Sequence, residues 1–172
     1  MRADAGFRSL SGLFYRIVPA DRADTALAPA QSPEGRFHHD GQSTLYVSSR
    51  PDWAEQAIRV YVRPEDPPRV ICEVDLAPTR VLDLRDATLG AALGVDPALA
   101  AVPWLPERAA GRPASSWRVA DAARAAGAEG MIYTARTEPA RWHLVLFDWQ
   151  AEGRARLTGQ RWPARFDGLL SG

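Results

Sequence analysis

The stretch that decides the fold runs from residue 34 to residue 49 and reads EGRFHHDGQSTLYVSS. Its second half alternates apolar Leu45 and Val47 with Tyr46 and Ser48, as a half-buried strand does. Its first half gathers an arginine, two adjacent histidines, an aspartate and two glycines. Three uses are open for these side chains: a metal site, a phosphate-binding site, or a polar hairpin without a ligand.

Strand and helix signals surround this stretch on both sides. Upstream, residues 13–18 (LFYRIV) are aromatic and β-branched enough for a first strand, and a loop rich in Pro and Ala follows. Downstream, Pro51 opens an amphipathic helix predicted over residues 51–62. Residues 69–76 and 79–84 then predict two strands separated by a turn at Pro78.

The second half of the chain adds one clear helix and three strands. Ser115 or Ser116 is expected to cap a helix that ends before Gly127. The strands are expected at residues 130–136, 142–149 and 155–162. This order predicts an α+β fold with a mainly antiparallel sheet and flanking helices, and 172 residues suit a single domain over residues 1–172.

Net charge, apolar runs and cysteine count argue against several classes of function. The formal net charge is zero, so no global positive field favours direct binding of nucleic acid or an anionic membrane. No run of eighteen apolar residues occurs. Cys72 is the only cysteine, which excludes an internal disulfide and a cysteine-rich zinc site. We expect a cytoplasmic protein in which Cys72 is a buried structural thiol.

A metal site and two common catalytic motifs are not expected. His38 and His39 are adjacent, so on an extended chain they point to opposite faces, and the third histidine, His143, is remote in sequence. No G-x-S-x-G nucleophile motif and no G-x-G-x-x-G dinucleotide motif occurs.

The residues that remain suit a dinucleotide. Arg36, and Arg16 on the first strand, offer planar sets of donors for a pyrophosphate. Tyr46, ten residues after Arg36, offers a ring on which a flat base can stack. The alternative is a surface hairpin in which the arginine forms an ordinary ion pair.

The ordered fragments LFYRIV, GRFHHDGQSTLYVSS, an alanine-rich helix, GAEGMIYTAR and HLVLFDW resemble the RES domain family. The resemblance covers about residues 14–150, and GRF…LYVSS is its most specific motif. It implies a fold similar to that of ADP-ribosyltransferase toxins. It also implies a toxin of a toxin-antitoxin module, with an Xre-like helix-turn-helix protein as its antitoxin partner.

The resemblance further implies that NAD is the substrate. Transfer of ADP-ribose to a protein acceptor is the preferred reaction, phosphorolysis or hydrolysis of NAD is the alternative, and a non-catalytic binding domain is the second alternative. On this reading the catalytic candidates are Arg36, Tyr46, Glu55 and His39. The NAD-binding candidates are Arg16, Arg36, His38, Tyr46, Ser48 and Thr134.

The chain departs from the family pattern at three places. Phe37 and His38 stand where most members have Trp-Asn. The position at which the family has its glutamate corresponds to Ile58 in this chain. Glu55, nearly one helical turn earlier, is the nearest acid that could replace it. The family serine falls on Ala135, with Thr134 as a neighbouring hydroxyl. The carboxylate that stabilises positive charge on the ribose is therefore expected from Glu55 or from the Asp40 loop, with a histidine activating the acceptor.

Overall fold

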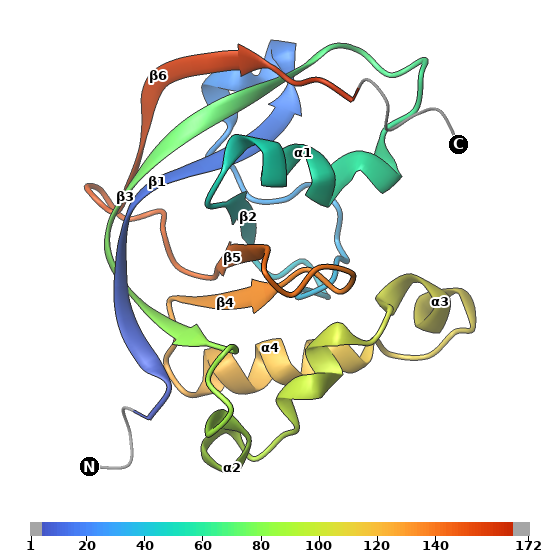
Figure 1. The fold of residues 1–172 in the computed structure, drawn as a ribbon, viewed down its shortest axis with the longest axis vertical. Helices are drawn as coiled ribbons and strands as arrows, with labels where there is room; N and C mark the ends of the chain where they lie inside the picture. Colours follow the sequence, from blue (N-terminus) through green and yellow to red (C-terminus); the bar gives the residue numbers. More distant parts are fainter. Residues whose placement is uncertain (1–4, 167–172) are drawn as a thin grey trace.

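A closed ring of five strands forms the centre of the domain. The computed structural model, which describes residues 5–166, gives the strand order β1-β2-β5-β4-β3, and β3 pairs with β1 to complete the ring. The sixth strand, β6, pairs with the first half of β3, and β4 pairs with its end. The strands, drawn in Figure 1, are β1 (Phe7–Pro19), β2 (Leu45–Ser48), β3 (Arg69–Asp83), β4 (Gly130–Thr134), β5 (Trp142–Leu146) and β6 (Ala155–Pro163).

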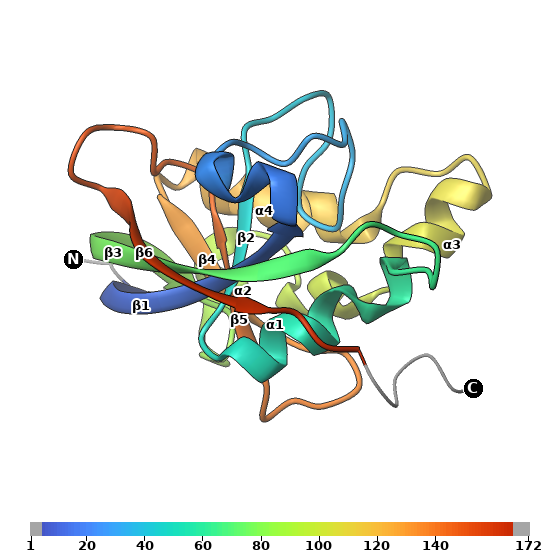
Figure 2. The ribbon, with the colours of Figure 1, turned by 90° about the horizontal axis from the view of Figure 1, so that it is seen from above.

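All strand pairings are antiparallel except that of β3 with β4. Seen from above, β1, β3 and β6 run side by side as one curved sheet (Figure 2). The predicted fold class, α+β with a mainly antiparallel sheet, is therefore confirmed.

Short helices cover the outside of the ring. They are η1 (Ala20–Thr25), α1 (Pro51–Ile58), η2 (Arg59–Tyr61), α2 (Leu89–Leu93), η3 (Pro97–Ala101), α3 (Trp104–Ala109) and α4 (Ser115–Ala125). In Figure 1, α4 lies along β4 on the side away from α1, while α1 contacts β1 and β2.

Alternation along the strands separates an apolar interior from a second, outward face. Leu45 and Val47 of β2 point into the ring with Leu144 and Leu146 of β5, and all four are buried. Burying each such side chain contributes about 1.5–3 kcal/mol relative to leaving it exposed. The ring interior is thus the main apolar core, as the alternation in TLYVSS predicts.

The outward face of β2, β5 and β4 is also buried, under α4. Val119, Ala120 and Ala123 of α4 pack on Met131 and Val145 of the sheet. The small alanines let the helix approach the sheet closely. The strands in this part of the ring therefore have two covered faces, and polar side chains on the outward face lie in an enclosed environment.

The predicted turn at Pro78 is wrong, because β3 continues through it. Leu10 pairs with Thr79 and Gly12 pairs with Leu76, so β3 has one extra residue there and bulges at Ala77–Pro78. A bulge tolerates proline because one residue leaves the hydrogen-bond ladder there. One long strand therefore replaces the two that the sequence suggests.

Two helix predictions are also corrected. The helix predicted over residues 51–62 is α-helical only over Pro51–Ile58 and then tightens into η2, leaving Tyr61 51% exposed. Neither Ser115 nor Ser116 caps α4, whose N-cap residue is Ala114. The Ser115 hydroxyl instead donates to the Glu107 carboxylate, 2.6 Å away.

Truncating a leucine inside the ring should destabilise the domain strongly. We expect Leu144→Ala to lower the free energy of unfolding by about 2–5 kcal/mol, because it leaves a cavity in the core. The matched control is Leu105→Ala on α3, where the side chain is 48% exposed and the expected change is within about 0.5 kcal/mol. Urea denaturation measures both, and equal losses would contradict the assignment of the core.

Candidate functional site

The site is built on the loop that carries Arg36, and the Tyr46 hydroxyl holds this loop against β2. The Tyr46 hydroxyl accepts a hydrogen bond from the Phe37 backbone N–H at 3.0 Å and lies 2.7 Å from Nδ1 of His38. A Cβ atom at residue 35 would lie 2.4 Å from the His38 ring and 3.0 Å from the Tyr46 hydroxyl. Gly35 is therefore required for space, which explains the Gly-Arg pair physically.

His38 is a structural member of this loop. Its Nε2 lies 2.8 Å from the Ser32 carbonyl oxygen, which can only accept, so Nε2 carries a proton. Burial lowers the pKa of His38, which keeps the ring neutral and leaves Nδ1 to accept from the Tyr46 hydroxyl. Every polar atom of the His38–Tyr46 pair is thereby used, and the ring is 2% exposed.

Helix α4 fixes the backbone around Arg36 from the other side. The Trp117 indole N–H donates to the Gly35 carbonyl oxygen at 2.8 Å, and the Ser116 hydroxyl donates to the Arg36 carbonyl oxygen. Phe37 is fully buried with its ring edge-on to Tyr133, 4.7 Å between centroids. The arginine backbone is thus held at both ends.

The Arg36 guanidinium is oriented by the protein before any ligand arrives. Its Nε and Nη2 both donate to the Ala100 carbonyl oxygen, at 3.1 and 2.8 Å. Its central carbon lies 4.9 Å from the ring centres of both Phe37 and Tyr133. Burial lowers the pKa of Arg36, yet no carboxylate pairs with it among the described residues. A buried cation without a paired acid attracts an anion.

Arg36 borders a cavity of about 200 Å³ between η3 and the end of β4. The cavity is large enough for part of a nucleotide but not for a whole dinucleotide. Its wall contains one cation, one phenol and one hydroxyl, and the rest is apolar. The lining residues are Arg36, Leu84, Pro97, Ala98, Ala100, Ala101, Tyr133 and Thr134.

A row of three polar side chains crosses the sheet beside Arg36. Strand register places Ser48 of β2 opposite His143 of β5, and His143 opposite Tyr133 of β4. The Ser48 hydroxyl lies 2.8 Å from Nδ1 of His143, and the His143 and Tyr133 rings are 5.5 Å apart. Burial raises the pKa of Tyr133 to about 12, so the phenol stays protonated. Of this row, the sequence prediction includes only Ser48.

Arg16 lies in the gap where β1 and β2 separate. Its Nη1 donates to the Tyr46 carbonyl oxygen at 3.3 Å, and its Nε is buried without a hydrogen-bond partner. Burial lowers the pKa of Arg16 to about 10, so the side chain remains cationic at neutral pH. Arg16 therefore supports β2 from the strand edge, and it is not among the residues that line the Arg36 cavity.

His39 faces α4, away from the cavity. Its Nδ1 lies 2.7 Å from the Asp40 carboxylate and its Nε2 lies 2.7 Å from the Asp121 carboxylate. The ring stacks on Trp117 with 4.6 Å between centroids. Partial burial lowers its pKa, but the hydrogen bonds to Asp121 and Asp40 outweigh burial, and the net pKa is raised. The contacts of His39 anchor the Arg36 loop to α4.

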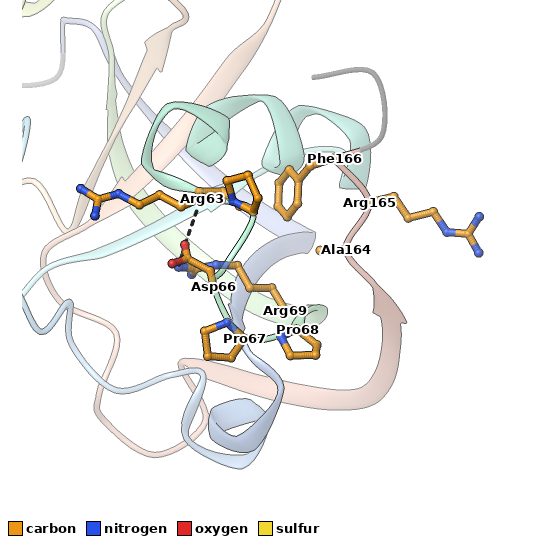
Figure 3. A pocket seen from close by; sticks show the side chains of 10 residues that line it. Arg63, Asp66, Pro67, Pro68, Arg69, Ala164, Arg165 and Phe166 are labelled. Carbon is orange, nitrogen blue, oxygen red and sulfur yellow. Dashed lines mark hydrogen bonds and ion pairs between the residues drawn. The ribbon is translucent and has the colours of Figure 1, made fainter. Parts of the chain in front are cut away.

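Glu55 points toward a different part of the molecule. Its Oε2 accepts a hydrogen bond from the Arg165 backbone N–H at 3.0 Å. Arg165 borders a second cavity, of about 310 Å³, between the 62–69 loop and residues 164–166. Proline rings and Phe166 form much of its wall, and the guanidinium groups of Arg63 and Arg165 point away from it (Figure 3). Arg69 also lines this larger cavity, but its guanidinium pairs with the Asp66 carboxylate at 3.6 Å, whereas Arg36 has no paired acid among the described residues.

Arg36, Tyr46 and Ser48 are therefore gathered around the outward face of β2, β5 and β4, and Thr134 lines the cavity at the end of β4. His38 completes the loop, while Arg16, His39 and Glu55 contact other groups. Among residues 5–166, no group of three or more His, Cys, Asp and Glu side chains could hold a metal ion. No helix in that range combines the length and apolar character needed to cross a membrane.

The sequence model of the RES domain matches residues 13–167. The chain belongs to the RES domain family. The predicted resemblance is thus confirmed, and the matched region extends beyond the expected residues 14–150. A search of curated proteins gave no match to this RES domain.

The RES domain also resembles a solved structure in its fold. It superposes with a TM-score of 0.62 on a chain of the crystal structure of the M. tuberculosis MbcT-MbcA toxin-antitoxin complex. The match has 18% sequence identity and covers 99% of this chain and 96% of that chain. Identity at this level describes a shared fold across almost the whole domain.

The anchor formed by His39 should make stability depend on pH. A raised pKa in the folded state means that the protonated ring contributes stability below its ordinary pKa of 6.5, and that this contribution disappears as pH rises through the higher folded value. We expect Asp121→Asn to reduce the free energy of unfolding more at pH 5.5 than at pH 8.5. Urea denaturation at both pH values measures this difference.

The control for this measurement is Asp52→Asn, because Asp52 pairs with Arg50 on the exposed side of α1 and contacts no histidine. The loss in this variant should be the same at both pH values. An equally pH-independent loss in Asp121→Asn would show that the His39 ion pair does not anchor the loop.

Proposed function

We propose that this RES domain is the toxin of a toxin-antitoxin pair and that it consumes NAD, transferring ADP-ribose to a cellular protein. The observation that carries the proposal is the partly buried Arg36 guanidinium, oriented by the Ala100 carbonyl oxygen at the wall of a cavity that Tyr133 also lines. A pre-oriented cation beside an aromatic ring suits a ligand that combines phosphate with a flat base.

Each residue has a distinct part in the proposed binding. Arg36 binds the pyrophosphate, because its remaining guanidinium nitrogen, Nη1, has no partner among the described residues. Thr134 offers a hydroxyl at the cavity wall. Tyr46 acts through its hydroxyl, which positions the Arg36 loop, while its half-buried ring packs on the core under α4. Arg16 supports β2 by donating to the Tyr46 carbonyl oxygen.

A second candidate function is nucleotide binding without turnover. Breaking the bond between nicotinamide and ribose develops positive charge on the sugar, which a carboxylate normally stabilises. No acid is among the residues that line the Arg36 cavity. Glu55 bonds to the Arg165 backbone and Asp40 bonds to His39. This arrangement favours binding alone unless another group, such as the protein acceptor, supplies the charge.

We further propose that the partner is an antitoxin with an Xre-like helix-turn-helix domain. The similar fold comes from a toxin-antitoxin complex, and family membership supports the same arrangement here. Co-expression with the product of the adjacent gene, followed by purification of the complex, addresses this partner directly.

Labelled NAD tests the proposed reaction. The purified domain is incubated with NAD labelled in the adenylate part, with and without cell lysate and phosphate, while nicotinamide release and protein labelling are followed. We expect nicotinamide release with label on protein. Arg36→Ala should reduce the rate at least about a hundredfold, because it removes a charged ligand contact and the group that fills the cavity wall.

The matched control is Arg118→Ala, which removes an arginine from the exposed side of α4 and should leave the rate unchanged. Binding of NAD without release under any condition would establish the non-catalytic alternative. Nicotinamide release with the label recovered in phosphorylated ADP-ribose would establish phosphorolysis. Release with the label recovered in free ADP-ribose would establish hydrolysis. Equal activity of Arg36→Ala and Arg118→Ala would place the site elsewhere.

A further inference from the structure

Three polar atoms in or near the Arg36 cavity have hydrogen-bonding capacity that the protein does not use. They are Nη1 of Arg36, the hydroxyl of Tyr133 and Nε2 of His143, none of which has a hydrogen bond within residues 5–166. Arg36 and Tyr133 line the cavity, and His143 lies next to Tyr133, with 5.5 Å between ring centroids. The buried side-chain atoms without partners are on Arg16, Arg69, Arg124 and Arg141. These three atoms are absent from that set, so each reaches solvent although its residue is largely buried.

The His143 ring is held in a fixed orientation. Its Nδ1 lies 2.8 Å from the buried Ser48 hydroxyl, and its ring contacts the Tyr133 ring at an interplanar angle of 33°. His143 is 4% exposed and Ser48 is 4% exposed, so neither side chain has room to turn. With Nδ1 used by Ser48, Nε2 on the far side of the ring is the atom that is left for a ligand.

The His143 ring is neutral at physiological pH. Burial, with the nearby positive charges of Arg36 and Arg141, lowers the pKa of His143 to about 4. A neutral imidazole and a protonated phenol both offer hydrogen bonds without charge. The site therefore has a cationic part at Arg36 and an uncharged polar part at Tyr133, which lines the cavity, and at the neighbouring His143.

We propose that His143 and Tyr133 bind the uncharged carboxamide of the ligand whose phosphates bind Arg36, which for NAD is the nicotinamide carboxamide. The inference rests on the proposed function and assigns the nicotinamide end of the site to residues of β4 and β5. A carboxamide presents one carbonyl oxygen and one amide N–H₂ side by side, and it matches a pair of neutral groups that can each donate or accept. Ser48 is a positioning residue that orients His143.

Two substitutions separate ligand binding from a purely structural role of His143. The amide nitrogen and oxygen of glutamine lie close to the position of the histidine Nε2, whereas those of asparagine lie close to Nδ1. His143→Gln therefore keeps a polar group toward the ligand, and His143→Asn keeps the bond to Ser48. If His143 binds the carboxamide, glutamine preserves binding and asparagine does not.

The experiment measures binding of two probes, nicotinamide and ADP-ribose, to the whole domain by NMR titration. We expect His143→Asn to weaken nicotinamide binding roughly five- to tenfold, the loss of one neutral hydrogen bond, while ADP-ribose binding is unchanged. His143→Gln should stay within about twofold of the wild type for both probes. Thermal unfolding of each variant reports whether the fold is retained.

The outcomes distinguish this inference from the proposed function. Nicotinamide binding that is retained in His143→Asn and lost in His143→Gln would show a structural role and overturn the inference. Wild-type protein that binds ADP-ribose but not nicotinamide would also overturn it, while leaving the Arg36 site in place. Binding of neither ADP-ribose nor nicotinamide by the wild type would overturn both the inference and the proposed function.

Discussion

The arrangement of the site depends on one hydroxyl group, that of Tyr46. It donates to Nδ1 of His38 and accepts from the Phe37 backbone N–H, so it connects β2 to the loop that carries Arg36. The environment is enclosed, and burial raises the pKa of Tyr46, which keeps the hydroxyl protonated and able to donate. Hydrogen bonds in such surroundings are costly to leave unmade, because the groups cannot turn to water instead.

This constraint explains why a glycine precedes the arginine. The His38 ring and the Tyr46 hydroxyl occupy the space that a side chain at residue 35 would need. The carbonyl groups of Gly35 and Arg36 then face α4, where Trp117 and Ser116 donate to them. The guanidinium can only extend toward η3, where the Ala100 carbonyl oxygen orients it.

Local patterns in the sequence predict the strands well, because alternation depends only on which face of a strand is buried. Arg36 is identified by the chemistry of its guanidinium and Ser48 by the family resemblance, and both belong to the stretch 34–49. Tyr133 and His143 are missed as site residues, because only the register across three strands brings them beside Ser48. Residues 130–134 and 142–146 are buried on both faces, so their sequences do not alternate and do not mark the outward residues.

Other differences come from contacts that local sequence does not encode. Pro78 suggests a turn, but it lies in a bulge of β3, and the strand continues past it. Glu55 is chosen as the acid nearest to the family position, yet it bonds to the Arg165 backbone, 110 residues later in the chain. The sequence suggests His39 as a possible base. In the structure His39 instead bonds to the carboxylates of Asp40 and Asp121 and stacks on Trp117, so it anchors the Arg36 loop to α4.

The most direct test of this account is the nicotinamide-release rate of Tyr46→Phe, measured together with its free energy of unfolding. The substitution keeps the ring, so a tyrosine that only stacks on a base would leave the rate nearly unchanged. We predict instead a loss of about 1–3 kcal/mol in stability, because His38 and the Phe37 N–H lose their partner, and at least a tenfold lower rate, because Arg36 is no longer held in place. A wild-type rate and wild-type stability in Tyr46→Phe would contradict the central role of this hydroxyl.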